Sequence, residues 1–167
     1  MGYHPTLVIF MKVLAIGDLH RKHKYLNSLL EFSKSYDRVV FVGDYADDFL
    51  YSFEDTLKIW ELLKSLDPNK YVVLLGNHDA AYAYSEEFYS RYRTLPIQSG
   101  WDSSTYFSLK NKPKIKEWLR KLPIVQEIDG VAYSHGGITP YWEESSEKDF
   151  IENYWNDLSP LWARPFE

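Results

Sequence analysis

Four short stretches of the chain place aspartate, asparagine or histidine side chains beside glycine. They are Gly17-Asp18-Leu19-His20, Gly43-Asp44-Tyr45-Ala46-Asp47, Gly76-Asn77-His78-Asp79 and Ser134-His135-Gly136-Gly137. Carboxylate, amide and imidazole donors without any cysteine suit manganese, iron or zinc rather than soft metals. Several carboxylates held close together repel one another and take up protons unless cations are present. These residue types therefore predict a centre that binds divalent metal ions.

Such a centre has a definite chemistry. Two divalent ions that share a carboxylate can activate water and stabilise an in-line displacement at phosphorus.

Each stretch by itself also has a purely structural explanation. A glycine-aspartate pair after a strand is commonly a turn, and Asn77 or Asp79 could cap a helix. The occurrence of all four stretches, in order, favours the functional interpretation.

The first three stretches each follow a run that is typical of a buried strand, at Val13–Ile16, Arg38–Val42 and Tyr71–Leu75. Between these runs, Lys24–Ser35 and Phe53–Leu66 carry apolar residues at helical spacing. This alternation predicts parallel strands joined by right-handed crossovers. Ligands of an open parallel sheet bind beyond the carboxyl ends of its strands. We therefore expect the polar residues to meet at one edge of the sheet.

The second half of the chain is less regular. Helices are predicted at Ala80–Tyr92 and Ile115–Leu122, with a loop at Pro96–Thr105 between them. Two strands, Ile124–Ile128 and Val131–Ser134, flank Asp129 and Gly130, and an Asp-Gly pair between apolar runs is a strong hairpin signal. The second hairpin strand leads directly to His135, which adds the fourth stretch to the site.

Composition narrows the class of protein. The chain has 167 residues, of which 45% are hydrophobic, and this fits one globular domain rather than a disordered chain. A net charge of −5 makes a nucleic-acid partner unlikely, since such partners are usually bound through phosphate neutralisation. The longest apolar run, Leu7–Ile16, is too short to cross a membrane, and no secretory leader is recognisable. With no cysteine, a cytoplasmic location is expected.

Together the four stretches resemble the motifs of the calcineurin-like metallophosphoesterase superfamily. The segment Ser134–Pro140 is similar to the His-Gly-Gly motif of its phosphoprotein phosphatase branch, which includes Ser/Thr phosphatases, phage and bacterial phosphatases, and symmetrical diadenosine tetraphosphatases. The resemblance implies an α/β fold, a four-layer α-β-β-α sandwich. It begins near Lys12, so residues 1–11 are expected to be an N-terminal extension or first strand and residues 12–167 the metallophosphoesterase domain.

The resemblance also implies a role for each of eight side chains. Asp18 and His20 would hold one divalent ion, Asp44 would bridge two ions, Asn77 and His135 would hold the second, His78 would be a general acid oriented by Asp47, and Arg164 would bind phosphate. The implied ions are manganese first, with iron or zinc as alternatives, and a hydroxide bridging them would be the nucleophile. The substrate would be a phosphorylated small molecule, a nucleotide or a phosphoprotein.

Two departures from the branch's pattern stand out. Asp48 occupies a position where its protein phosphatases usually have arginine, which weakens the phosphoprotein interpretation and leaves more of the phosphate charge to Arg164. No histidine follows His135, so the last metal-binding histidine of the superfamily has no counterpart. The closing strands that would carry it are also missing, and we expect a C-terminally incomplete domain whose second sheet lacks its last strands.

Two alternatives remain open at this point. The missing histidine is compatible with a degenerate, non-catalytic relative that binds metal or a partner. A nuclease-type phosphodiesterase is disfavoured by the acidic charge and the His-Gly-Gly form. The aromatic C-terminal region, with Trp142, Trp155 and Trp162, is expected either to pack into the core or to form a homo-oligomer contact.

Overall fold

A three-stranded parallel sheet lies at the centre of the protein. The computed structural model describes residues 11–92, 109–139 and 159–163. Strands β1 (Val13–Ile16), β2 (Arg38–Phe41) and β3 (Tyr71–Val73) pair in the order β1-β2-β3. Val13 is opposite Arg38, and Val39 is opposite Tyr71. The predicted strand at Val13–Ile16 is confirmed in its bounds, and the other two end one and two residues earlier than expected.

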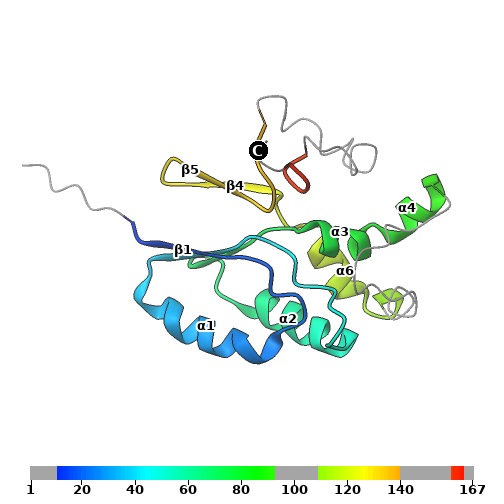
Figure 1. Ribbon diagram of the computed structural model, residues 1–167, viewed down its shortest axis with the longest axis horizontal. Helices are drawn as coiled ribbons and strands as arrows, with labels where there is room; N and C mark the ends of the chain where they lie inside the picture. The colour runs from blue at the N-terminus through cyan, green and yellow to red at the C-terminus, as the bar shows by residue number, and fades with distance from the viewer. Residues whose placement is uncertain (1–10, 93–108, 140–158, 164–167) are drawn as a thin grey trace, which may run out of the picture.

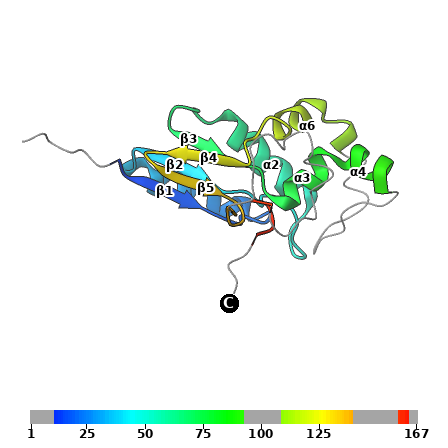
Figure 2. The same ribbon diagram turned by 90° about the horizontal axis from the view of Figure 1, so that it is seen from above.

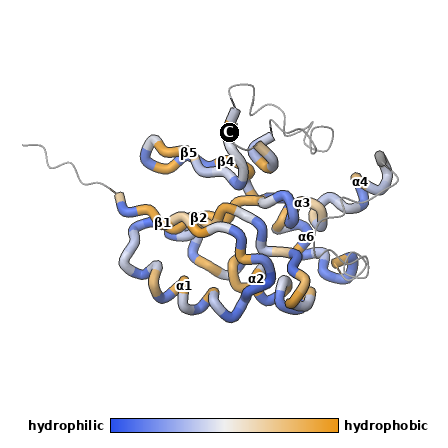
Figure 3. The backbone as a smooth tube through the Cα atoms, viewed as in Figure 1, coloured by the Kyte–Doolittle hydropathy of each residue, from blue (hydrophilic) through white to orange (hydrophobic). Residues whose placement is uncertain are grey.

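The connections between these strands are helical and cover one face of the sheet (Figure 1). The β1–β2 connection consists of η1 (His23–Tyr25), α1 (Leu26–Phe32) and η2 (Ser33–Ser35), where the sequence predicted one continuous helix. The β2–β3 connection is α2 (Phe53–Ser65), which begins with a capping box between Ser52 and Asp55. Trp60 of α2 is fully buried in the core between helices and sheet. Strands β1 and β2 are coloured largely as hydrophobic in Figure 3.

Helical segments also follow β3. They are α3 (Asn77–Ala83), α4 (Ser85–Tyr92) and α6 (Pro113–Leu119). The single helix predicted at Ala80–Tyr92 is therefore two helices, and the first begins at Asn77 because Gly76 already has the extended backbone of an N-cap. Pro113 opens α6, where its fixed φ is compatible with a first helical turn. The predicted loop at Pro96–Thr105 lies outside the described residues.

The predicted hairpin forms a second layer on the other face of the sheet. Strands β4 (Val125–Ile128) and β5 (Val131–Ser134) are antiparallel, and the turn residues Asp129 and Gly130 have φ of 52° and 77°. Both values belong to the left-handed region that a two-residue hairpin turn requires. Figures 1 and 2 show the hairpin lying over the sheet. Ile128 of the hairpin packs with Val40 and Leu74.

The predicted α/β fold class is confirmed. Of the four expected layers, the described residues build three: helices α1 and α2, the parallel sheet, and the hairpin (Figure 1). Residues 1–10 of the expected extension and most of the aromatic C-terminal region lie outside the described residues. In the described ranges, no helix combines the length and the apolar character that crossing a membrane would need.

Candidate metal centre

Seven of the eight predicted site residues lie in the described residues, just beyond the carboxyl ends of strands. Asp18 and His20 follow β1, Asp44 and Asp47 follow β2, Asn77 and His78 open α3 after β3, and His135 follows β5. Asp44 lies at the middle of this group. Its Oδ2 atom is 3.3 Å from Nε2 of His135, 3.8 Å from Nε2 of His20 and 3.9 Å from Nε2 of His78. One buried carboxylate oxygen therefore faces three imidazoles.

Two of these imidazoles, those of His20 and His135, are oriented by hydrogen bonds from their other ring nitrogen, Nδ1. The Nδ1 atom of His20 lies 2.9 Å from the carbonyl oxygens of both Ala46 and Asp47. The Nδ1 atom of His135 lies 3.1 Å from the carbonyl oxygen of Val42. A carbonyl only accepts hydrogen bonds, so each Nδ1 is the donor and each Nε2 faces Asp44. This is the arrangement in which an imidazole offers its Nε2 lone pair to a metal.

Two groups of donor atoms are close enough to hold ions, and Asp44 belongs to both. One consists of His20, Asp44 and His78, and the other of Asp18, Asp44 and His135, with all donor atoms of a group within 4.8 Å of one another. Carboxylate and imidazole donors of this kind fit manganese, iron or zinc. The residues present therefore fit a centre for divalent metal ions built around Asp44.

Asp44 and His135 shift each other's pKa values. Burial would raise the pKa of its carboxyl group, but the hydrogen bond and charge of His135 and the charge of His78 outweigh burial and lower it. Burial would lower the pKa of His135, but its hydrogen bond and ion pair with Asp44 raise it. A divalent ion bound here would replace such protons, because a metal-bound imidazole must be neutral.

The loops that carry the site have a strained backbone. Asp18, His20, Arg21, Asp44 and Asp47 have φ between 38° and 63°. Left-handed conformations cost non-glycine residues on the order of 1 kcal/mol each, and they persist where the surroundings hold them. Here backbone bonds hold them: the amide of His20 donates to the Asp44 carbonyl and the amide of Arg21 to the Tyr45 carbonyl, both at 2.9 Å. The loops after β1 and β2 thus support each other.

Two glycines allow the loops after β2 and β3 to approach closely. A Cβ atom on Gly76 would lie 2.1 Å from the backbone nitrogen of Asp44 and 2.3 Å from its Oδ1. Gly43 has a φ of 107°, and its Cβ would lie 2.5 Å from the Cα of Gly76. A side chain at Gly76 would therefore displace Asp44, and one at Gly43 would displace the backbone of Gly76.

We therefore expect Gly76→Ala to displace Asp44 and to destabilise the protein by about 1–3 kcal/mol, the usual cost of overpacking. The midpoint of thermal unfolding should fall by several degrees, and the increase in that midpoint on adding Mn²⁺ should disappear. The matched control is Gly137→Ala, whose Cβ would meet Ala163 at an ordinary 3.5 Å. Equal behaviour of the two variants would contradict the prediction.

His78 forms a second arrangement beside Asp44. Its Nδ1 lies 2.8 Å from Oδ2 of Asp47, a carboxylate with no exposed surface, while its backbone amide donates to Oδ1 of Asp44 at 3.1 Å. Burial would lower the pKa of His78, but its hydrogen bond to Asp47 and the charges of Asp44 and Asp47 raise it. A protonated imidazole whose Nε2 faces the centre is suited to donate a proton there. Asn77, at the first position of α3, is buried next to it.

Sequence reasoning missed three buried side chains around these residues: Arg21, Asp79 and Tyr82. The carboxylate of Asp79 accepts hydrogen bonds from the amides of Tyr45 and Ala46 and, at 3.0 Å, from Nε1 of Trp60. It thereby holds the loop that carries Asp44. Asp79 stood inside a recognised motif, but nothing in the sequence showed that it faces the core rather than the metal centre.

Because Asp79 is buried, we expect the stability of the protein against unfolding to depend on pH. Burial, followed by the charge of Asp44, raises the pKa of Asp79 from 3.8 to about 7. A carboxyl group whose folded pKa is raised stabilises the protein fully below the unfolded pKa, and this stabilisation is lost as pH rises through the folded pKa. With metals removed by a chelator, the unfolding midpoint should therefore fall as pH rises from about 4.5 to 7. Asp79→Asn should flatten this slope, and an unchanged slope would contradict the assignment.

Asp48 and Arg164 are the two remaining residues that the sequence analysis singled out. The Asp48 carboxylate pairs with Lys22 at 3.2 Å and accepts the amide of Leu50. Arg164 lies outside the described residues. The turn just before it, residues 159–163, contacts the His-Gly-Gly stretch: the Gly136 amide donates to the Pro160 carbonyl, and the Gly137 amide donates to the Ala163 carbonyl.

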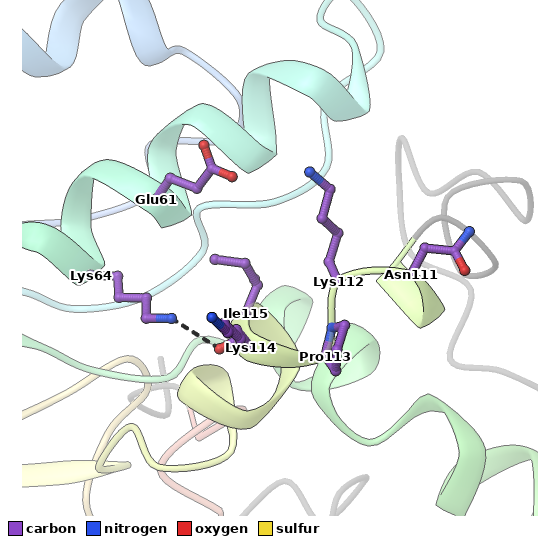
Figure 4. A pocket seen from close by; sticks show the side chains of 7 residues that line it. All are labelled: Glu61, Lys64, Asn111, Lys112, Pro113, Lys114 and Ile115. Atoms are coloured by element: carbon purple, nitrogen blue, oxygen red, sulfur yellow. Dashed lines mark hydrogen bonds between the residues drawn. The ribbon is translucent and has the colours of Figure 1, made fainter.

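A separate cavity of about 420 Å³ lies between α2 and α6 (Figure 4). Its polar side chains include Glu61, Lys64, Lys112 and Lys114, around Ile115 and Pro113. Lys64 donates to the carbonyl of Lys114 at 3.1 Å. None of the described site residues predicted from the sequence lines this cavity.

Fold and site together define the class of the protein. The chain matches the calcineurin-like phosphoesterase family over residues 11–165 and belongs to that family, which binds divalent metals in a binuclear centre. It is 34% identical to a symmetrical bis(5'-nucleosyl)-tetraphosphatase from Methylobacillus flagellatus over 136 residues, which are 79% of this chain and 45% of that protein. It is 31% identical to the corresponding protein of Vibrio campbellii, over 91% of this chain and 60% of that protein. The chain thus spans about half the length of these curated relatives.

Solved structures share the fold. A cold-active protein-tyrosine phosphatase of a psychrophilic Shewanella species matches 92% of this chain and 57% of its own, with a TM-score of 0.64 and 18% identity. A metallophosphoesterase from Sphaerobacter thermophilus matches 80% of this chain and 50% of its own, with a TM-score of 0.51 and 21% identity. At these identities the likeness establishes the fold alone.

Proposed function

We propose that the protein hydrolyses phosphomonoesters or phosphoanhydrides at the metal centre around Asp44. The observation that carries the proposal is the convergence of three imidazole Nε2 atoms within 4 Å of one Asp44 oxygen, beside the His78–Asp47 pair. A purely structural cluster has no need of three imidazoles facing one buried carboxylate. A centre that binds cations and donates a proton needs such a set.

In this proposal the side chains have distinct roles. Asp18, His20, Asp44, Asn77 and His135 hold two divalent ions, manganese being the first choice. When bound, the ions activate water and neutralise charge on the phosphoryl group. His78 gives its Nε2 proton to the leaving oxygen as the P–O bond breaks and its electron pair moves to that oxygen. The water oxygen forms the new P–O bond, and a proton of that water replaces the one that His78 lost.

Asp47 keeps the Nδ1 proton of His78 in place, and Arg164 would pair with the phosphate oxygens through its guanidinium group. The turn at residues 159–163, immediately before Arg164, contacts Gly136 and Gly137, and this supports a position near His135. A homo-oligomer contact through the aromatic C-terminal region stays a prediction.

The substrate is proposed to be a nucleotide phosphoanhydride of the dinucleoside polyphosphate type. Both curated relatives described above are named symmetrical bis(5'-nucleosyl)-tetraphosphatases. A phosphoprotein substrate is less well supported, because Asp48 stands where the protein phosphatases usually have arginine and its carboxylate pairs with Lys22. A like-charged carboxylate near the site cannot bind phosphate.

The test is turnover of p-nitrophenyl phosphate and of diadenosine tetraphosphate with Mn²⁺, with and without a chelator, combined with metal analysis. The proposal predicts two ions per chain, hydrolysis with Mn²⁺ and none with the chelator. Faster hydrolysis of bis-p-nitrophenyl phosphate than of the monoester would instead indicate a phosphodiesterase.

A non-catalytic relative that binds a metal or a partner is the alternative that this test distinguishes. One ion or none per chain, together with no turnover on any of these substrates, would establish this alternative and refute the proposal.

A further inference from the structure

Arg21 is a buried cation next to the proposed site. It follows His20 directly, is 4% exposed and has a left-handed φ of 60°. Its guanidinium donates to the Thr56 hydroxyl (3.1 Å), the Asp48 carbonyl (3.2 Å), the Tyr51 carbonyl (2.9 Å), Oδ1 of Asp47 (3.2 Å) and the Tyr82 hydroxyl (3.5 Å). These contacts match the five N–H groups of a guanidinium, so Arg21 is fixed in one orientation.

Tyr82 reaches the same carboxylate from another element. It belongs to α3, is 1% exposed, and its ring lies 5.8 Å from the ring of Phe53 and 5.6 Å from that of Trp60. Its hydroxyl donates to Oδ1 of Asp47. Aromatic packing therefore fixes the ring, and the hydroxyl is aimed at Asp47 alone among the described carboxylates.

The two oxygens of Asp47 have different partners. Oδ1 accepts from Arg21 and Tyr82, whereas Oδ2 accepts from Nδ1 of His78 at 2.8 Å. With Oδ1 held from two directions, the carboxylate cannot rotate about its bond to Cβ without breaking both contacts. The plane of Asp47, and through it the ring of His78, is thereby determined.

We propose that Arg21 and Tyr82 are positioning residues, which fix Asp47 so that His78 presents its Nε2 to the leaving oxygen. This inference rests on the proposed function, because it assumes that His78 is the general acid. Burying Arg21 against Asp47 is costly unless both are fully hydrogen bonded, as they are here. The left-handed backbone of Arg21 adds a conformational cost, which its contacts with the surrounding residues must offset.

A merely structural role for Arg21 is the competing explanation. Its bonds to the carbonyls of Asp48 and Tyr51 also anchor the loop that leads to α2, so Arg21→Ala could simply unfold that loop. Tyr82→Phe separates the two explanations, because it keeps the packed ring and removes only the hydroxyl. The matched control is Tyr84→Phe, whose hydroxyl donates to the Arg120 carbonyl at 3.3 Å instead.

The experiment compares two substrates with Mn²⁺ present. Phenyl phosphate has a basic leaving oxygen that needs a proton, and p-nitrophenyl phosphate has a leaving group that departs readily without one. For Tyr82→Phe we expect kcat on phenyl phosphate to fall about tenfold, kcat on p-nitrophenyl phosphate to fall less than about threefold, and KM to stay unchanged. Equal losses on both substrates, or no loss on either, would overturn the inference.

A second measurement needs neither metal nor turnover. In the protein with chelator, the Nδ1 proton of His78 should give a far-downfield NMR signal, identified by its loss in His78→Asn. Tyr82→Phe should move this signal and speed its exchange with water, while Tyr84→Phe should not. If the unaltered protein hydrolyses neither ester, the proposed function fails, and the NMR signal alone decides the positioning role. A signal unchanged by Tyr82→Phe overturns that role.

Discussion

Replacement of Asp44 by asparagine is expected to lower the turnover of p-nitrophenyl phosphate at least about a thousandfold. Asp44 is buried, belongs to both groups of donor atoms, and faces the Nε2 atoms of His20, His78 and His135. Asparagine has nearly the same shape but no charge, and its amide group would turn hydrogens toward imidazoles or cations. The variant should therefore lose metal as well as activity.

The measurement pairs steady-state turnover with metal content per chain. The control is Asp67→Asn, because Asp67 caps the turn before β3 through the amide of Asn69 and lies in the exposed α2–β3 connection. It should retain both metal and turnover. An Asp44→Asn protein as active as the unaltered chain would disprove the catalytic centre described here.

Of the substitutions proposed, Asp47→Ala should lower the free energy of unfolding the most. Its side chain is fully buried and accepts from Arg21, Tyr82 and His78. Removing the carboxylate leaves the Arg21 guanidinium buried without its counter-charge, a change that typically costs about 3–5 kcal/mol. Such a loss is a large share of the roughly 5–15 kcal/mol that keeps a domain folded. Loss of His78 orientation should lower activity about a hundredfold or more in any protein that still folds.

Urea unfolding of the metal-free protein measures this effect. Asp48→Ala is the control, since its partly exposed pair with Lys22 contributes at most about 1 kcal/mol. If Asp47→Ala and Asp48→Ala unfold at the same urea concentration, the buried pair between Arg21 and Asp47 does not stabilise the fold.

Local patterns were enough to predict much of the architecture. The strand Val13–Ile16 is confirmed in its bounds, and the hairpin is confirmed with Asp129 and Gly130 at its turn. Both rest on short-range rules: apolar runs form buried strands, and an Asp-Gly pair accepts left-handed φ. The meeting of the loops after β1 and β2 was also predicted, because parallel strands direct their carboxyl ends to one edge. His135 was added to the site because it directly follows the second hairpin strand.

Other features depend on contacts between distant parts of the chain. Asn77 was expected to precede a helix starting at Ala80, yet it is itself the first residue of α3. In the sequence, Arg21 is the first of several basic residues after His20. Its burial depends on Asp47 and Tyr82, which lie 26 and 61 positions further along the chain. No local pattern in the sequence identifies partners so far apart, so the contacts that hold Asp47 and His78 in place could not be predicted from it.

The turn around His135 has a consequence for the order in which the protein assembles. The loops after β1 and β2 find backbone partners in each other, so they can come together early during synthesis. The amides of Gly136 and Gly137 donate to the carbonyls of Pro160 and Ala163, which leave the ribosome some two dozen residues later. A nascent chain would thus hold an incomplete cluster until residues 159–163 dock, and His135 would be the last of its imidazoles to take its place.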